Sequence, residues 1–331
     1  MSTSLSPAVS VVIPLYNKVD LVAEAIESVL SQDFEDFEIV IVDDGSTDGS
    51  GQIAQGYAER LGGRCTYVRQ ERAGAGAARN RGMRMANGEL VAFLDADDVW
   101  IPQKLGRQVR FLQSHPDIQW CATNYWIGQR DGATHGAAVP YDEAHAGEAW
   151  IVVDWFAAMS QRHIAFQASG AMLRRSLIQQ AGEFDVMIPS GQDFDYWVRI
   201  GEITPMCGYL LAPCYTLSRD SSYSITFNDP EKYSGKVRML APLMERSIQP
   251  GRSPAYQDLI RSVSVDMVHG SIAEGRPDVA RALLRTFPKQ WRGARYVGYL
   301  LLACVPASIF RYLALGWHRA GRPFRSRIRG T

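Results

Sequence analysis

Short apolar runs alternate with amphipathic segments along the N-terminal part of the chain. A strand buried on both faces carries a continuous apolar run, whereas a surface helix repeats its apolar residues every three or four positions. The continuous runs predict strands at Val9–Leu15, Phe37–Val42, Cys65–Gln70 and Glu89–Leu94. The helical pattern predicts helices at Lys18–Gln32 and Ala77–Ala86, with another after the turn that follows Val42. Strands alternating with helices in this way form a mostly parallel sheet with helices on both faces.

The pattern is less regular beyond Trp100. It predicts helices at Ile101–Gln113 and Ser190–Ile203, and strands at Ile118–Ile127, Ala168–Arg174 and Met206–Leu217. Residues 128–147 form a Gly-, Ala- and His-rich loop, and loops of that length are typically functional or mobile.

From about Pro230 the apolar pattern is helical throughout. One predicted stripe consists of Tyr256, Ile260, Val263 and Met267, and another of Val279, Leu283 and Leu284. We therefore predict one α/β domain at residues 1–229 and a helical C-terminal extension at residues 230–331.

The run Glu89–Asp98 (ELVAFLDADD) changes abruptly from apolar to acidic at its end. In open α/β sheets, ligands bind at the carboxyl ends of the strands, and Asp95 and Asp97 could both face a hard cation and its phosphate ligands there. The alternative is that Asp95, Asp97 and Asp98 form a polar turn that caps the next helix.

Two other nucleotide-binding signatures are disfavoured. The segment GAGAAR at residues 74–79 begins like a dinucleotide fingerprint, but Arg79 stands where a small residue is needed for close packing of helix on sheet. The strand ending in LDADD could belong to a P-loop enzyme, yet the chain contains no GxxxxGK[ST] sequence.

Taken together, several segments resemble glycosyltransferase family 2. The donor-side segments are VSVVIPLYN, EIVIVDDGSTDGS, GAGAARNRG and VAFLDADD, and the later ones are GAMLRRSLIQQAGEFD and SGQDFDYWVRI. The resemblance covers roughly Val9–Arg199. It implies a GT-A type fold, with a Rossmann-like, mostly parallel mixed sheet flanked by helices. It also implies a nucleotide-sugar half at about residues 9–100 and an acceptor half at about residues 101–229.

The resemblance assigns roles in donor binding. Pro14 and Tyr16 would shape and stack the base pocket. Asp43 would accept the uracil N3 proton, which suits an acceptor-only carboxylate. Asp44 would hold the ribose or orient Asp43, or else serve as a turn residue. Arg79 would read base or phosphate through its fixed guanidinium, the alternative being a surface helix arginine.

The same resemblance assigns the DADD carboxylates. Asp95 would contact the ribose, and Asp97 would bind the divalent cation that bridges the donor phosphates. Oxygen ligands favour Mn²⁺ or Mg²⁺ over zinc. Such a cation would neutralise charge on the departing nucleoside diphosphate.

Asp193 lies where the family has its catalytic base. That base must be within hydrogen-bond reach of the acceptor hydroxyl, so that oxygen attacks the anomeric carbon opposite the leaving group and inverts it. The family residue is usually the second of a Glu-Asp pair, but here Gln192 precedes it. A capping box of Ser190 with Asp193 is the structural alternative, and the two roles are compatible.

Composition limits the remaining possibilities. The formal net charge is zero, so the chain as a whole gives no indication of nucleic-acid binding. The five cysteines form no CxxC pair, which argues against a disulfide framework and a zinc site. The N-terminus lacks the pattern of a signal peptide, so we expect a cytoplasmic protein.

The C-terminal segment adds a possible membrane contact. Tyr296–Phe310 is uncharged and largely apolar, and an arginine-rich tail follows it. The segment is shorter than the roughly 20 residues that span a bilayer. It therefore predicts either an interfacial helix on the anionic inner face of the cell membrane or a helix that packs on the protein core.

The sequence thus predicts an inverting glycosyltransferase of the family 2 type. It would move a sugar from a nucleotide-diphosphate sugar, preferably a UDP-sugar, to a hydroxyl of a glycan or lipid-linked acceptor in cell-surface polysaccharide synthesis. The alternatives are a non-catalytic nucleotide-sugar-binding module and an NAD(P)-dependent oxidoreductase.

Overall fold

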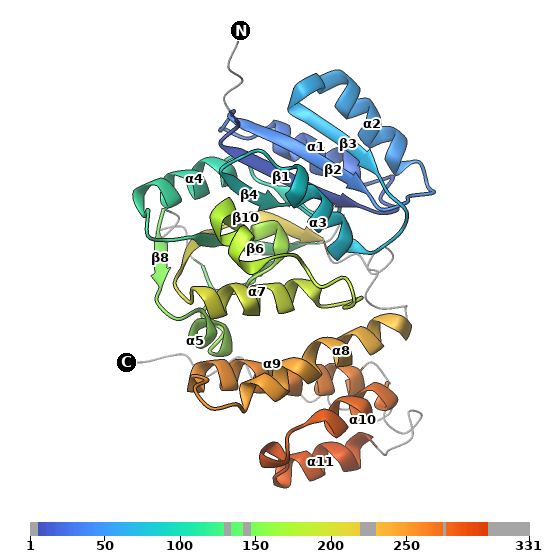
Figure 1. Cartoon of the computed structure of the whole chain (residues 1–331), viewed down its shortest axis with the longest axis vertical. Helices are drawn as coiled ribbons and strands as arrows, with labels where there is room; N and C mark the ends of the chain where they lie inside the picture. The colour runs from blue at the N-terminus through green and yellow to red at the C-terminus, as the bar shows by residue number, and fades with distance from the viewer. Residues whose placement is uncertain (1–5, 129–133, 142–146, 219–229, 274–275, 304–331) are drawn as a thin grey trace. The chain divides into compact units, whose positions relative to one another are not determined.

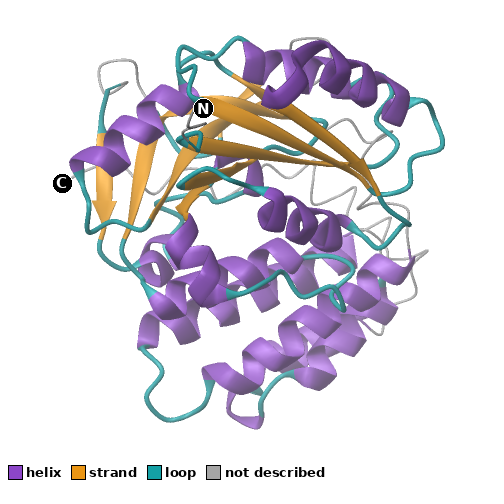
Figure 2. Cartoon of the chain, turned by 45° about the horizontal axis from the view of Figure 1, so that its top comes forward, coloured by secondary structure: helices purple, strands orange, loops and turns teal. Residues whose placement is uncertain are grey.

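The chain divides into two compact units in its computed structural model. Unit 1 comprises Met1–Asp229 and unit 2 comprises Pro230–Thr331. The structure describes residues 6–128, 134–141, 147–218, 230–273 and 276–303. Unit 1 is a sheet with helices, whereas the regular structure described in unit 2 is helical (Figures 1 and 2).

The elements before Trp100 lie close to their predicted positions. The strands of unit 1 are β1 (Val9–Leu15), β2 (Phe37–Asp43), β3 (Cys65–Arg69), β4 (Leu90–Phe93), β5 (Val99–Trp100), β6 (Trp120–Gly128), β7 (Thr134–Ala137), β8 (Ala149–Val152), β9 (Met172–Arg174) and β10 (Cys207–Ser218). Its α-helices are α1 (Val22–Leu30), α2 (Ser50–Leu61), α3 (Ala75–Met85), α4 (Lys104–Ser114), α5 (Trp155–Ser160), α6 (Arg175–Ala181) and α7 (Gln192–Ile203).

The strands form one mixed sheet in the order β3-β2-β1-β4-β9-β6-β10-β5, with β7 paired to β6 and β8 to β10. Strands β3, β2, β1 and β4 are parallel neighbours, and β9 is antiparallel to both β4 and β6. Because β1, β2 and β4 run in one direction, the turns after them open at the same edge of the sheet. This arrangement confirms the predicted α/β fold.

Helix α3 packs unusually close to β1. A Cβ atom added at Gly82 would lie 2.3 Å from Val12 Cγ1, so only glycine allows this approach. Arg79 does not hold the helix away from the sheet, contrary to the expectation from its size. The close contact occurs at Gly82, and Arg79 lies buried on the same helix one turn earlier.

The acceptor half departs more from prediction. The strand predicted at Ala168–Arg174 begins only at Met172, because Ala168–Gly170 forms a 3-10 turn. Strand β7 lies within the predicted loop, and β8, α5 and α6 were not predicted, nor was the short strand β5 just before this half. These elements are short, and pairing with distant strands or packing against other helices stabilises them more than their own sequence pattern does.

Aromatic side chains form the core beneath α7. Trp197 is 1% exposed, and its ring centroid lies 5.2 Å from Phe166 and 6.4 Å from Trp120. Phe184 packs against Tyr196 with 4.0 Å between centroids. This packing fixes α7 on the sheet and places Trp197 in the core.

Unit 2 contains α8 (Pro230–Ser247), α9 (Pro254–Ala273), α10 (Pro277–Thr286) and α11 (Ala294–Ala303). Tyr256 and Ile260 are buried as predicted, but the interior stripe of α9 continues through Ser264 and Val268 and not through Val263 and Met267. Within the described ranges, no helix is long and apolar enough to cross a membrane.

Candidate active site

The acidic turn after β4 is fixed from the acceptor half of unit 1. The backbone N–H of Asp95 donates to Ser169 Oγ at 3.0 Å, and that hydroxyl donates to Asp98 Oδ2 at 2.6 Å. Trp100 Nε1 donates to the Ser169 carbonyl at 2.9 Å. Asp98 is therefore buried and structural, whereas the Asp95 and Asp97 side chains remain 35% and 27% exposed.

Arg79 extends from α3 to this turn and pairs with Asp95. Its Nη2 donates to Asp95 Oδ1, while Nε and Nη1 are buried and have no hydrogen-bond partner in the described part of the chain. Burial lowers the pKa of the guanidinium, but the charges of Asp95 and Asp193 outweigh it and the pKa is raised. Arg79 is only 5% exposed, so it is not a surface helix arginine.

Lys18 pairs with the second carboxylate of the turn. Its Nζ donates to Asp97 Oδ2 at 2.6 Å, and the lysine side chain is only 7% exposed. The Lys18–Asp97 pair was not predicted. A signal was nevertheless present, because Lys18 lies three residues beyond the end of β1, which is the neighbour of β4.

Asp193 lies in the first turn of α7. Gly191, at φ 86°, is the N-cap of the helix, so Ser190 and Asp193 do not form the predicted capping box. The Phe194 N–H donates to Asp193 Oδ1 at 2.9 Å. Burial raises the pKa of Asp193, although the Arg79 guanidinium opposes the shift. Asp193 is thus within electrostatic reach of the Arg79–Asp95 pair.

Asn80 connects α3 to the segment that leads into α7. Its Nδ2 donates to the Phe184 carbonyl at 2.9 Å, and its Oδ1 accepts from the Phe184 N–H at 2.7 Å. Arg199 supports the same segment from α7, donating to the carbonyls of Ala181 and Glu183 and to Asp195. These contacts hold Asp193 in position relative to Arg79.

The predicted base-pocket carboxylates are buried and accept hydrogen bonds from other groups of the protein. Asp43 is 0% exposed; its Oδ1 accepts from the Ser46 N–H and its Oδ2 from the Tyr67 hydroxyl, both at 2.8 Å. Asp44 accepts from Gln70 Nε2 and from the N–H groups of residues 73 and 74. In this conformation both aspartates organise the surrounding loops, and the predicted base contact of Asp43 stays a prediction.

Tyr16 is half-buried, and the guanidinium of Arg72 lies over its ring at 4.4 Å from the centroid. Pro14 is buried within β1, opposite Val42 of β2. A base that stacked on this face of Tyr16 would have to displace Arg72 or insert beneath it. Arg72 was not predicted; it lies two residues before Gly74, where the donor-side segment GAGAARNRG begins.

The carboxylates suit a cation that is also held by the donor. Among the described residues, no group of three or more His, Cys, Asp or Glu could hold a metal ion. Mg²⁺ is typically bound by one or two carboxylates together with substrate phosphates. Asp97, partly exposed and next to Asp95, fits that arrangement, and the ion pair with Lys18 opposes binding of the metal alone.

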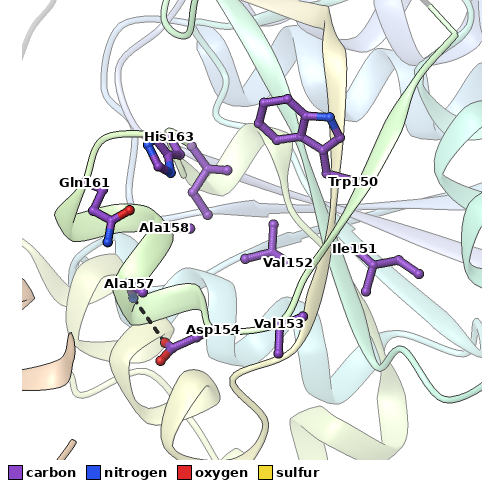
Figure 3. A pocket seen from close by; sticks show the side chains of 10 residues that line it. Trp150, Ile151, Val152, Val153, Asp154, Ala157, Ala158, Gln161 and His163 are labelled. Atoms are coloured by element: carbon purple, nitrogen blue, oxygen red, sulfur yellow. Dashed lines mark hydrogen bonds between the residues drawn. The ribbon is translucent and has the colours of Figure 1, made fainter. Parts of the chain in front are cut away.

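A cavity of about 320 Å³ lies elsewhere in unit 1 (Figure 3). Its lining includes Trp150, Val152, Ala158 and His163 from β8, α5 and the following turn. Strand β8 pairs with the first residues of β10, which runs parallel to β6 and hence to β4. The cavity therefore lies toward the opposite edge of the sheet from Asp95, and we exclude it from the candidate site.

The family model for glycosyl transferase family 2 matches residues 10–178. This chain belongs to glycosyltransferase family 2. Among relatives, it is 40% identical over 131 residues to TuaG of Bacillus subtilis, for which a glycosyltransferase role in teichuronic acid biosynthesis is proposed. That match covers 39% of this chain and 51% of TuaG. An uncharacterised glycosyltransferase of Rickettsia prowazekii is 28% identical over 202 residues, covering 60% of each chain. Other relatives are matched over about a third of their length.

Solved structures support the GT-A type fold of this family 2 protein. S. aureus TarS 1-349 in complex with UDP-GlcNAc superposes with a TM-score of 0.62 at 16% identity, covering 96% of this chain and 93% of TarS 1-349. The mannosyltransferase PcManGT from Pyrobaculum calidifontis, in complex with GDP-Man and Mn²⁺, gives a TM-score of 0.53 at 19% identity, covering 96% and 89%.

Proposed function

We propose that this family 2 protein is a metal-dependent, inverting glycosyltransferase. It transfers a sugar from a nucleoside-diphosphate sugar, preferably a UDP-sugar, to a hydroxyl of a glycan or lipid-linked acceptor in cell-surface polysaccharide synthesis. The observation that carries the proposal is the grouping of Arg79, Asp95, Asp97 and Asp193 at one edge of the sheet.

The donor is proposed to bind along the ends of β1, β2 and β4. Tyr16, Asp43 and Asp44 would form the base end, and Asp95 would contact the ribose. The buried Nε and Nη1 atoms of Arg79 offer unused donors for an anionic or carbonyl group, which favours a ligand there because unpaired buried donors are costly. Asp97 would bind Mn²⁺ or Mg²⁺, which would stabilise charge on the departing diphosphate.

Asp193 would act as the general base. It would accept the proton of the acceptor hydroxyl while that oxygen attacks the anomeric carbon from the face opposite the diphosphate. Burial raises its pKa, which makes it a better proton acceptor than an ordinary aspartate, and the charge of Arg79 opposes that shift. Val186 and Met187, 53% and 70% exposed on the loop before α7, offer an apolar surface to such an acceptor.

Ligand-induced stabilisation tests the donor class. UDP with Mn²⁺ should raise the melting temperature of the protein by about 5 to 10 °C at one hundred times its Kd, because ligand binds only the folded state. UDP without metal should give a smaller shift, and NAD(P) should give none. A shift with NAD(P) that survives chelation would instead support an oxidoreductase.

A membrane surface is proposed as a further partner of unit 2. Val297 and Leu301 lie one turn apart on α11 and are 53% and 67% exposed. The same helix contacts the rest of unit 2, where Arg281 donates to the Ala303 carbonyl and His269 packs on Tyr299. An exposed apolar stripe on an anchored helix suits binding in a lipid interface. Residues 304–310 of the predicted apolar segment and the arginine-rich tail lie outside the described residues.

The double variant Val297→Ser/Leu301→Ser should bind anionic liposomes at least about tenfold more weakly than wild type in sedimentation assays, because it removes two apolar side chains from the interface. Val153→Ser is the matched control, since Val153 is 74% exposed on unit 1. Equal liposome binding by all three proteins would show that this stripe does not contact lipid.

A further inference from the structure

Lys18 is held in place by a braced turn between β1 and α1. Asn17 adopts φ 48°, a left-handed conformation that is uncommon for residues other than glycine. Its N–H donates to Ser46 Oγ at 3.0 Å, and its Oδ1 accepts from the Thr47 N–H at 2.9 Å. The Lys18 N–H donates to Ser50 Oγ at 2.7 Å. Strain at a turn persists only where the surroundings enforce it, so this turn is built to fix Lys18.

The turn directs the Lys18 side chain inward, although lysine usually extends into solvent. The residue is 6% exposed, and its ammonium pairs with Asp97 at 2.6 Å. Asp97 itself is the more open partner, with its side chain 27% exposed. A ligand can therefore reach the carboxylate from outside while Lys18 stays on the protein side.

We propose that Lys18 is an exchangeable counter-charge of the donor site: it holds Asp97 before the metal binds and then pairs with the donor diphosphate. This inference rests on the proposed function. It assigns to Lys18 a positioning role before donor binding and a phosphate-binding role afterwards.

Electrostatics favour such an exchange. The Lys18 ammonium on Asp97 Oδ2 repels a divalent cation at the same carboxylate, so cation binding weakens the Lys18–Asp97 pair. Loss of the Asp97 charge destabilises a largely buried ammonium, and a second anion at the same place offsets that loss. The diphosphate that arrives with the cation is an anion of the right kind at that place. We therefore expect metal and donor to bind with positive cooperativity. Lys18 opposes binding of the metal alone, and its ion pair with Asp97 opposes its pairing with the donor diphosphate alone.

Lys18→Met tests the first half of the exchange, with free Mn²⁺ followed by electron paramagnetic resonance in the absence of nucleotide. The variant should bind Mn²⁺ about three- to tenfold more tightly than wild type, because the metal no longer displaces an ammonium. Lys18→Arg keeps the charge and should resemble wild type. Arg60→Met is the matched control, since it removes the cation of an exposed ion pair with Glu27.

The second half of the exchange predicts the opposite effect of Lys18→Met on nucleotide affinity. With saturating Mn²⁺, Lys18→Met should bind UDP about tenfold or more weakly by calorimetry, because a charge-assisted contact to phosphate is lost. Uridine, which lacks phosphate, should bind both proteins equally. A residue that merely stabilised the fold would weaken both ligands and Mn²⁺ together.

Equal Mn²⁺ affinity in wild type and Lys18→Met, including undetectable binding by both, overturns the exchange. So does unchanged UDP affinity. If Lys18→Met does not fold, Lys18→Gln replaces it, with melting curves recorded for each protein. Failure of wild type to bind UDP with Mn²⁺ refutes the proposed function, whereas normal wild-type binding without these opposite changes refutes only the exchange.

Discussion

Asp193→Asn should reduce sugar transfer by about 10²- to 10⁴-fold, the range that a positioned general base contributes. The amide keeps the size of the side chain and can still accept the hydrogen bond from the Phe194 N–H. Because Arg79 and Asp97 are unchanged, binding of UDP with Mn²⁺ should remain within about twofold of wild type. Single-turnover transfer rates and calorimetry separate the two effects. An Asn variant with undiminished transfer would refute the base assignment.

Matched controls make that result specific. Asp36→Asn removes an exposed carboxylate just before β2 and should leave the transfer rate unchanged. If the chain is a non-catalytic binding module, Asp193→Asn should alter no transfer activity at all, since wild type would have none.

The pH dependence gives an independent check on Asp193. A base works only when ionised, so the rate should rise with pH as Asp193 loses its proton. Burial raises the pKa of Asp193, so this rise should occur at higher pH than for an ordinary aspartate. Arg79 lowers that pKa, so Arg79→Gln should move the acidic limb of the kcat profile upward, whereas Arg79→Lys should move it less. A limb that stays in place would contradict the coupling.

The parallel half of the sheet could be predicted because its strands are buried on both faces. Every residue of β1 and β4 is buried, so an apolar run of the right length left few alternatives. The acceptor half could not be predicted as well. Strand β8 has three exposed residues of four and forms only because it pairs with β10, a strand that begins more than fifty residues later.

The sequence indicated which carboxylates gather at the sheet edge but not how each is paired. Asp95 and Asp97 follow a buried strand, so their location was predictable from the strand end. Their partners come from other elements: Arg79 from α3 and Lys18 from the turn after β1. The pattern placed Lys18 at the start of a helix, whereas α1 begins at Val22, and the left-handed turn at Asn17 has no signature in the apolar pattern.

The hydrogen-bond partners of Asp43 were likewise not predicted from the sequence. The family resemblance predicts that Asp43, at the end of β2, contacts the base, and this stays a prediction; in the structure its oxygens accept hydrogen bonds from the Tyr67 hydroxyl and the Ser46 N–H. Strand position fixes where a residue lies along the sheet edge. Which way its side chain turns depends on donors brought by other segments, here a tyrosine on β3 and a backbone amide.

Asp97→Asn should remove most of the Mn²⁺-dependent part of UDP binding. Loss of groups that only orient metal ligands typically costs 10- to 100-fold in metal affinity, so loss of the ligand itself should cost more than about 100-fold. The amide is nearly the same size and lies on a partly exposed side chain, so the fold should be retained. Calorimetric titration of UDP with and without Mn²⁺ measures the difference.

The Asp97→Asn variant also separates the effect of the Lys18 ammonium from that of Mn²⁺. Lys18 pairs with Asp97 in the structure, and Mn²⁺ is proposed to bind the same carboxylate. Without the Asp97 charge, the Lys18 ammonium loses its ion pair with residue 97 and can pair with phosphate instead, so UDP binding without metal should be at least as tight as in wild type. Asp117→Asn, which removes an exposed carboxylate beyond α4, should leave both titrations unchanged. If UDP binding by Asp97→Asn kept its full dependence on Mn²⁺, the ligand assignment would be wrong, and Asp95 would be the carboxylate to examine next.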